Sequence, residues 1–199
     1  VIGVIYFRSL SFVGSIELVL HRVIWTAVML LITTLCLSKW HKIKTLLLDK
    51  KIFFNLIITG VLIFTNWSVW IYAVSTNQIV DASFGYFIMP ILSVLFGYLF
   101  FKEILNKSRI FSILLVLISI IIMILFNLKS LPWVGLIVAL SWAFYNLVRK
   151  KIIIDTDIGL LIESLFIFPF ALIVFYLIFK SGLNDFNFQN PGLSLLLLL

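Results

Sequence analysis

The sequence predicts an all-α, polytopic transmembrane helical bundle, and three observations predict it. Hydrophobic residues make up 63% of the 199 residues and charged residues only 12%, against about half and about a quarter in soluble domains. The apolar residues form runs long enough to cross a membrane, and most of the charged residues stand between these runs. The single cysteine, Cys36, excludes an intrachain disulfide scaffold, and the density of Leu, Ile, Val and Phe excludes a disordered chain.

Six full membrane spans are predicted, with part of a further span at each end of the chain. A helix crosses the hydrocarbon core with about 20 apolar residues. The runs that meet this length are residues 15–37, 52–74, 82–101, 110–126, 131–148 and 158–179. Residues 1–7 and 193–199 are apolar but shorter, and no methionine starts the chain. We therefore expect a fragment of a longer membrane protein.

The basic residues predict how the spans are oriented. If residues 1–7 end a first span, the loops after the second, fourth and sixth spans carry eleven of the fifteen Lys and Arg residues. The opposite side carries Arg8, Lys129 and Lys180. Short basic loops stay in the cytoplasm, so we expect the eleven-residue side to be cytoplasmic. No nucleic-acid-binding motif accompanies the net charge of +7, so we expect no nucleic-acid partner.

The second part of the chain repeats the pattern of the first. A shift of 142 residues places residues 15–21 on residues 157–163 and Arg8 on Lys150. A repeat of five helices, an odd number, enters the membrane from the opposite face in its second copy, and the alternation of basic loops agrees. We expect inverted five-helix repeats, residues 1–130 forming the first and 131–199 the start of the second. Such repeats are typical of secondary transporters, with the solute site between the halves.

Ionisable side chains within the spans are the first candidates for function, because charges are costly in lipid. Glu163 either carries a proton through a transport cycle or stays matched with Arg22 or a tyrosine. Arg22 is expected about 10 Å below the start of its span. There it either anchors an anion or pairs with a carboxylate of a neighbouring helix, or it forms an ion pair near the helix end and reaches the interface. Glu17 and His21 share a helix face, and we expect Glu17 to form an ion pair that reaches the interface.

Polar and aromatic residues in the third, fourth and sixth spans predict a cavity lining. An amide within a span needs a partner across a helix interface, and aromatic walls suit a planar or amphipathic solute. The alternative is the interfacial aromatic belt, which suits Trp70 and Tyr72. The candidates for the lining are Asn66, Trp67, Tyr86, Trp142, Tyr145 and Asn146. In the sixth span Arg149 shares one helix face with Trp142 and Asn146.

Two prolines within spans predict hinges. Pro90 and Pro169 each remove a backbone hydrogen bond and are expected to bend their helices. Ser93 and Gly97 have the spacing that lets two helices approach closely. Around a central cavity, such bends suit a moving transporter.

The sequence shows no motif that is typical of catalysis or of metal binding. His21 and His41 are expected on opposite sides of the bilayer, and no phosphate loop or nucleophilic constellation is apparent. We expect no enzyme, no metal and no cofactor. A non-transporting membrane scaffold or sensor stays open as the alternative. In that case the buried polar groups pair with one another and leave no cavity.

Several segments resemble the RarD family, which belongs to the EamA group of the drug/metabolite transporter superfamily. The similar segments are residues 17–25 (ELVLHRVIW), Asn66-Trp67 with residues 71–74 (IYAV), residues 81–90 (DASFGYFIMP), Lys102-Glu103, residues 130–132, Tyr145 with residues 147–152, and Gly159 with residues 162–163. The resemblance implies a ten-helix protein of the bacterial inner membrane that acts as a permease or exporter of small molecules. Its members carry the label chloramphenicol-sensitive protein. Asp81 stands where the family has Glu, and Met89 and Ser93 stand where it has Asn.

Together these observations predict a truncated ten-helix transporter that moves a small organic solute by alternating access, driven by the proton gradient. Glu163 is the expected proton carrier, with Arg22 as its partner or as an anion anchor. Asn66, Tyr86 and Trp142 are expected to line the cavity. The substrate, the direction of transport and self-association in the membrane lipid stay open.

Overall fold

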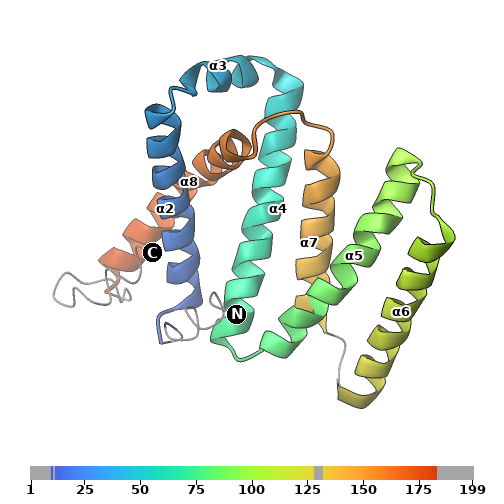
Figure 1. Ribbon diagram of the computed structural model, residues 1–199. Helices are drawn as coiled ribbons and strands as arrows, with labels where there is room; N and C mark the ends of the chain where they lie inside the picture. Colours follow the sequence, from blue (N-terminus) through green and yellow to red (C-terminus); the bar gives the residue numbers. More distant parts are fainter. Residues whose placement is uncertain (1–9, 11, 128–131, 183–199) are drawn as a thin grey trace.

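The computed structural model describes residues 10, 12–127 and 132–182, and within them it forms seven helices (Figure 1). Their bounds are α2 Ser15–Cys36, α3 Trp40–Leu48, α4 Lys50–Ser75, α5 Ile79–Phe101, α6 Lys107–Asn127, α7 Trp133–Arg149 and α8 Thr156–Lys180. These parts of the chain contain no strand, so the all-α prediction is confirmed for them.

Four of the helices are long and apolar enough to cross a membrane, namely α2, α4, α5 and α8. The two other predicted spans correspond to α6, with 21 residues, and α7, with 17 residues. With a rise of about 1.5 Å per residue, a helix of the length of α7 reaches only about 25 Å. The partial spans predicted at residues 1–7 and 193–199 lie outside the described residues.

The short helix α3 occupies a segment that was predicted only as a basic loop. Ile43 is 3% exposed and packs in one apolar cluster with Leu56 of α4 and Ile158 of α8. Asp49 then caps α4, since its Oδ1 accepts hydrogen bonds from the backbone N–H groups of Lys51 at 2.9 Å and Ile52 at 3.1 Å. The connection between α2 and α4 is therefore anchored on the bundle.

Helix α4 lies within the bundle and contacts α2, α7 and α8, while α5 packs on α7 and α6 packs on α5 at one edge (Figure 1). Two glycines allow the backbones of α5 and α7 to touch. A Cβ atom on Gly85 would lie 2.5 Å from the carbonyl oxygen of Gly135, and one on Gly135 would lie 2.3 Å from that of Asp81. The close approach predicted at Ser93 and Gly97 is therefore found elsewhere on α5. Gly97 instead makes room for the Glu103 carboxylate.

The three basic connections, α2–α4, α5–α6 and α7–α8, lie at the same end of the bundle (Figure 1). Carboxylates tie them together. Lys39 Nζ lies 2.6 Å from Asp157 Oδ2, Lys42 Nζ lies 2.7 Å from Asp155 Oδ2, and Lys150 pairs with Glu103. The hydrogen bond and charge of Lys150 hold the pKa of Glu103 below its usual value. We call this the basic end.

The two prolines lie inside their helices, Pro90 in α5 and Pro169 in α8. Neither proline ends its helix, because helical structure continues on both sides. Their role as hinges stays a prediction.

Candidate functional site

The carboxylate of Glu163 is fully buried, with 0% exposure, between α8, α4 and α7. The hydroxyl of Thr59 donates a hydrogen bond of 2.7 Å to Oε1, and that of Tyr145 donates one of 3.3 Å to Oε2. Arg149 Nε lies 3.7 Å from Oε1. A buried carboxylate needs such donors, since an uncompensated charge in the interior costs several kcal/mol. The cation beside Glu163 is thus Arg149, whereas the sequence suggested Arg22.

Gly60 explains how α4 comes close enough for Thr59 to reach the carboxylate. A Cβ atom on Gly60 would lie 3.2 Å from the carbonyl oxygen of Glu163 and 3.4 Å from its Cα. The bare backbone of α4 therefore packs directly on the backbone of α8. This contact places the neighbouring Thr59 hydroxyl against Glu163.

Arg149 is held near Glu163 by the absence of a side chain on Gly159. A Cβ atom there would lie 2.1 Å from Arg149 Nη1, so the guanidinium group fills this space. Nη2 donates to the carbonyl oxygen of Thr156 over 3.5 Å. Nη1 is buried and has no hydrogen-bond partner among the described residues. The guanidinium group is therefore positioned by shape, with only long polar contacts.

A cavity of about 650 Å³ opens beside this cluster. Its volume lies within the range of about 300–1,000 Å³ that is common for small-molecule sites. Four helices and the α7–α8 connection contribute to its wall. The lining residues are Arg22, Ile63, Trp67, Trp142, Tyr145, Asn146, Arg149, Lys150, Ile152, Ile154, Thr156 and Leu160.

The cavity wall combines aromatic rings with basic groups. The guanidinium carbon of Arg22 lies 4.4 Å from the centroid of the Trp67 ring. Trp142 and Tyr145 stack with centroids 5.4 Å apart and planes at 26°. Within the described lining, every charged residue is basic, and Glu163 lies behind Tyr145 and Arg149. Five of the predicted site residues are thus brought together here, namely Arg22, Trp67, Trp142, Tyr145 and Asn146.

Asn66 and Tyr86 lie outside this lining. Asn66 is 8% exposed, and its Nδ2 donates to the carbonyl oxygen of Val138 at 2.9 Å and to Ser141 Oγ at 3.1 Å. This amide joins α4 to α7, as expected for an amide within a span. Tyr86 is 52% exposed on α5. We had expected both side chains to line the cavity.

Glu17 and His21 are buried near the start of α2. Glu17 is 2% exposed, so the expectation that it reaches the interface is wrong. His21 Nε2 lies 3.9 Å from Glu17 Oε1, and Trp25 Nε1 donates to His21 Nδ1 over 3.2 Å. The His21 ring also contacts that of Phe175 edge to face. These contacts join α2 to α8 away from the described cavity lining.

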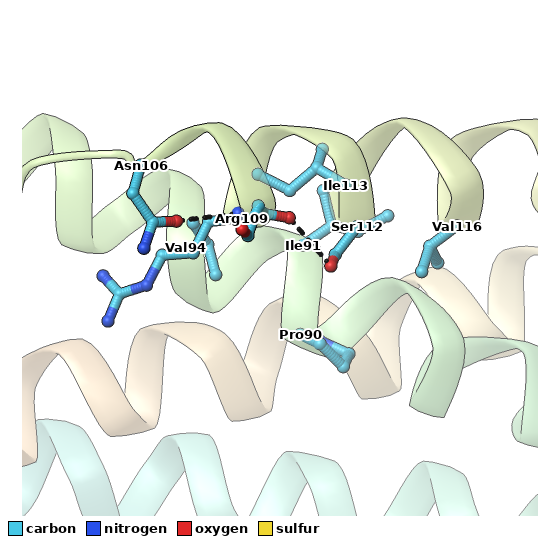
Figure 2. Close-up of a pocket in the computed structure, with 9 residues that line it drawn as sticks. Pro90, Ile91, Val94, Asn106, Arg109, Ser112, Ile113 and Val116 are labelled. Carbon is cyan, nitrogen blue, oxygen red and sulfur yellow. Dashed lines mark hydrogen bonds between the residues drawn. The ribbon is translucent and has the colours of Figure 1, made fainter.

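A second, smaller pocket of about 250 Å³ lies between α5 and α6 (Figure 2). Pro90, Ile91 and Val94 form its α5 wall, and Ile113 and Val116 contribute to the facing wall. At its edge, Asn106 Oδ1 accepts a hydrogen bond of 2.8 Å from the backbone N–H of Arg109, which caps α6. This pocket is mainly apolar. Its described lining contains no aromatic ring, and its charged residue is Arg109.

Sequence reasoning missed Thr59 and the contact between Arg149 and Glu163. The helical spacing that places Arg149 on one face with Trp142 and Asn146 did indicate a shared cavity wall, and all three residues line the cavity. The spacing gave no sign that Arg149 would also lie beside Glu163. For Thr59 no such signal exists, because threonine is common in apolar helices and often bonds its own backbone.

The helices and the cavity define a polytopic membrane protein with a solute-sized site between its helices. The chain matches the EamA-like transporter family over residues 1–125 and belongs to that family. It is 35% identical over 197 residues to an uncharacterized transporter of Vibrio cholerae, and 34% identical over 194 residues to protein RarD of Escherichia coli. It is 25% identical over 175 residues to the chloramphenicol-sensitive protein RarD of Pseudomonas aeruginosa. The resemblance to the RarD family is thus confirmed.

The first two matches cover 98% and 97% of this chain, and 65% of the length of each relative. The third covers 86% of the chain and 58% of the relative. The chain therefore spans 65% of the length of these two relatives. No solved structure matches the chain.

Proposed function

We propose that the full-length protein is a secondary transporter that moves a small organic solute across the bacterial inner membrane by alternating access. The observation that carries the proposal is that two residues belong both to the cavity wall and to the cluster around Glu163. Tyr145 and Arg149 line the solute-sized cavity and also contact the buried Glu163. Occupation of the cavity and the charge of Glu163 are therefore coupled through the same two side chains. Family membership supports transport as the class of function.

Glu163 is the proton carrier in this proposal. As a carboxylate it attracts Arg149 and accepts from Tyr145 and Thr59. When it takes up a proton it loses its charge, so Arg149 is released toward the cavity. The ionisable groups of α7 that contact Glu163 are Tyr145 and Arg149. Helix α2, which packs on α8, carries Glu17, His21 and Arg22.

The architecture of the whole protein follows from the repeat. We assign residues 1–130 to a first five-helix repeat and residues 131–199 to the start of an inverted second one, which makes α2 and α8 counterparts. Their first residues, Ser15 and Thr156, differ by nearly the repeat shift, and the two helices pack against each other. A two-fold relation between repeats allows counterpart helices near its axis to pack against each other. The basic end is cytoplasmic in this proposal.

Glu163→Gln in full-length protein tests proton coupling. The substitution keeps the size of the side chain but fixes it in the neutral form. Proteoliposomes with an internal pH dye would receive chloramphenicol and a panel of aromatic acids under an imposed pH gradient. We expect solute-dependent proton flux to fall to the level of empty vesicles, while membrane insertion is retained.

Glu103→Gln is the matched control, because Glu103 is a carboxylate at the basic end outside the cavity lining. It should leave the flux unchanged. Unaltered flux in the Glu163→Gln protein would remove Glu163 from the mechanism.

The alternative is a membrane scaffold or sensor that transports nothing. Its favouring observation is that Glu163 and Asn66 both have protein partners. The cavity beside them counts against it, because a scaffold has no need for a solute-sized space with basic walls. Absence of flux for every solute tested would favour this alternative.

A further inference from the structure

We propose that the cavity binds an organic anion, an aromatic or amphipathic carboxylate, and that Arg149 is the cation that anchors it. The inference rests on the proposed function and adds the chemical class of the solute. Three observations carry it: the unused donors of Arg149, the sign of the charges in the wall, and the aromatic surfaces beside them.

Arg149 has more donors than the described residues use. A guanidinium group offers five N–H donors in a planar fork that matches a carboxylate. Its nearest carboxylate atom, Glu163 Oε1, is 3.7 Å from Nε, which is beyond hydrogen-bond distance. The contact of Nη2 with the Thr156 carbonyl is 3.5 Å long, and Nη1 has no partner among the described residues. A carboxylate entering the cavity would supply the acceptors that this group lacks.

The charges of the wall favour an anion over a cation. The charged side chains in the described lining are Arg22, Arg149 and Lys150. The nearby carboxylates, Glu163 and Glu103, lie outside the lining. A cationic solute would therefore meet only like charges on the cavity surface. An anionic solute would meet favourable charges there.

The remaining walls favour an apolar body on that anion. Trp142 stacks on Tyr145, and Trp67 presents its ring to the same cavity. Ile63 and Leu160 add aliphatic surface. Inorganic phosphate or a small sugar acid would leave these surfaces uncovered, whereas an aryl carboxylate covers them and reaches Arg149 with its charged end.

Gly159 provides a variant that moves the cation without removing it. A methyl group at this position would lie 2.1 Å from Arg149 Nη1 and 2.6 Å from its Cζ, both in the far end of a flexible side chain. The Gly159→Ala helix can therefore form while the guanidinium group is displaced. Gly14→Ala is the matched control, because a Cβ atom there meets nothing within 4 Å.

The test is isothermal titration of the full-length protein in lipid nanodiscs with 1-naphthoate and with its neutral counterpart, 1-naphthamide. We expect naphthoate to bind at least about tenfold more tightly, which is typical of one charge-assisted contact. Gly159→Ala should weaken naphthoate binding about tenfold and leave naphthamide binding unchanged. Gly14→Ala should change neither.

The double variant Arg149→Gln with Glu163→Gln removes the cation without leaving a buried carboxylate unpaired, so it should fold and should lose the preference for naphthoate.

Equal binding of the two probes, or no binding of either, overturns the inference. Full naphthoate affinity in the Gly159→Ala protein overturns the role of Arg149. If only a neutral solute is transported under the gradient, the proposed transport function holds and the anion site is rejected. If naphthoate binds tightly and no solute is transported, the anion site holds and the proposed transport function is rejected.

Discussion

At the scale of single residues, the buried carboxylate of Glu163 depends on donors from two other helices. Thr59 makes the shortest of its contacts, 2.7 Å, from a hydroxyl that is itself fully buried. Because the acceptor is a carboxylate without access to solvent, loss of this donor cannot be replaced by water. We therefore expect the hydroxyl of Thr59 to make a measurable contribution to the free energy of unfolding.

Thr59→Val keeps the shape of the side chain and removes this donor. We expect the free energy of unfolding to fall by about 1.5–3 kcal/mol, the range for hydrogen bonds to charged groups. Denaturant titration of the purified protein in detergent measures the change. Thr65→Val is the control on the same helix, since that exposed hydroxyl donates to the Val61 carbonyl of its own helix at 2.8 Å. Equal losses of unfolding free energy in the two variants would show that the hydrogen bond from Thr59 to Glu163 adds no more stability than an ordinary hydroxyl–backbone hydrogen bond.

The sequence was informative about side chains that are unusual within an apolar span. Glu163, Arg22 and Trp142 stand out for this reason, and the structure places the last two in the cavity wall and Glu163 directly behind it. The pairing of Glu163 with Arg149 could not be predicted. It depends on the α7–α8 connection turning back so that residues 149 and 163 come to the same level. It also depends on Gly159 leaving room for the guanidinium group.

At the scale of elements, the helices themselves were predictable and their contacts were not. Within the described residues, each of the six full apolar runs became a helix because its length and composition leave few other structures in a membrane. Helix α3 was missed because its lysines resemble a loop, while its stability comes from Ile43 packing on α4 and α8. The spacing of Ser93 and Gly97 indicated a close helix approach, whereas the backbones of α5 and α7 touch at Gly85 and Gly135. Small-residue spacing on one helix does not identify the facing partner.

Gly135→Ala tests this crossing. The added methyl group would lie 2.3 Å from the backbone carbonyl oxygen of Asp81, which cannot move without shifting α5. We expect a loss of about 1–3 kcal/mol in the free energy of unfolding, as for overpacked cores. Thermal unfolding in detergent measures it, with Gly14→Ala as the control. An unchanged midpoint would mean that the two backbones do not touch.

At the scale of the whole molecule, the charge pattern predicted which connections share an end of the bundle. The structure gathers the α2–α4, α5–α6 and α7–α8 connections at the basic end (Figure 1). It also shows a second role for their lysines, because Lys39, Lys42 and Lys150 pair with carboxylates of other elements. The relation between the two repeats stays a prediction, since it requires helices beyond the described residues.

The orientation of the molecule in the membrane can be tested on α4, whose two ends lie at opposite ends of the bundle. Lys51 is exposed at the basic end of this helix, and Thr76 is exposed just after its other end. In full-length protein without other cysteines, including Cys36→Ser, we would compare Lys51→Cys with Thr76→Cys. A maleimide that cannot cross membranes would be added to intact spheroplasts and to permeabilised ones.

Because short basic connections are retained in the cytoplasm, the cysteine at position 51 should react only after permeabilisation. The cysteine at position 76 should react in intact spheroplasts. Each variant thus serves as the other's control, since both lie on one helix and differ only in the end they report. The reverse pattern would place the basic end outside and reject the cytoplasmic assignment. Labelling of both positions from the same side would show that α4 does not cross the membrane, and the alternating-access proposal would fall with it.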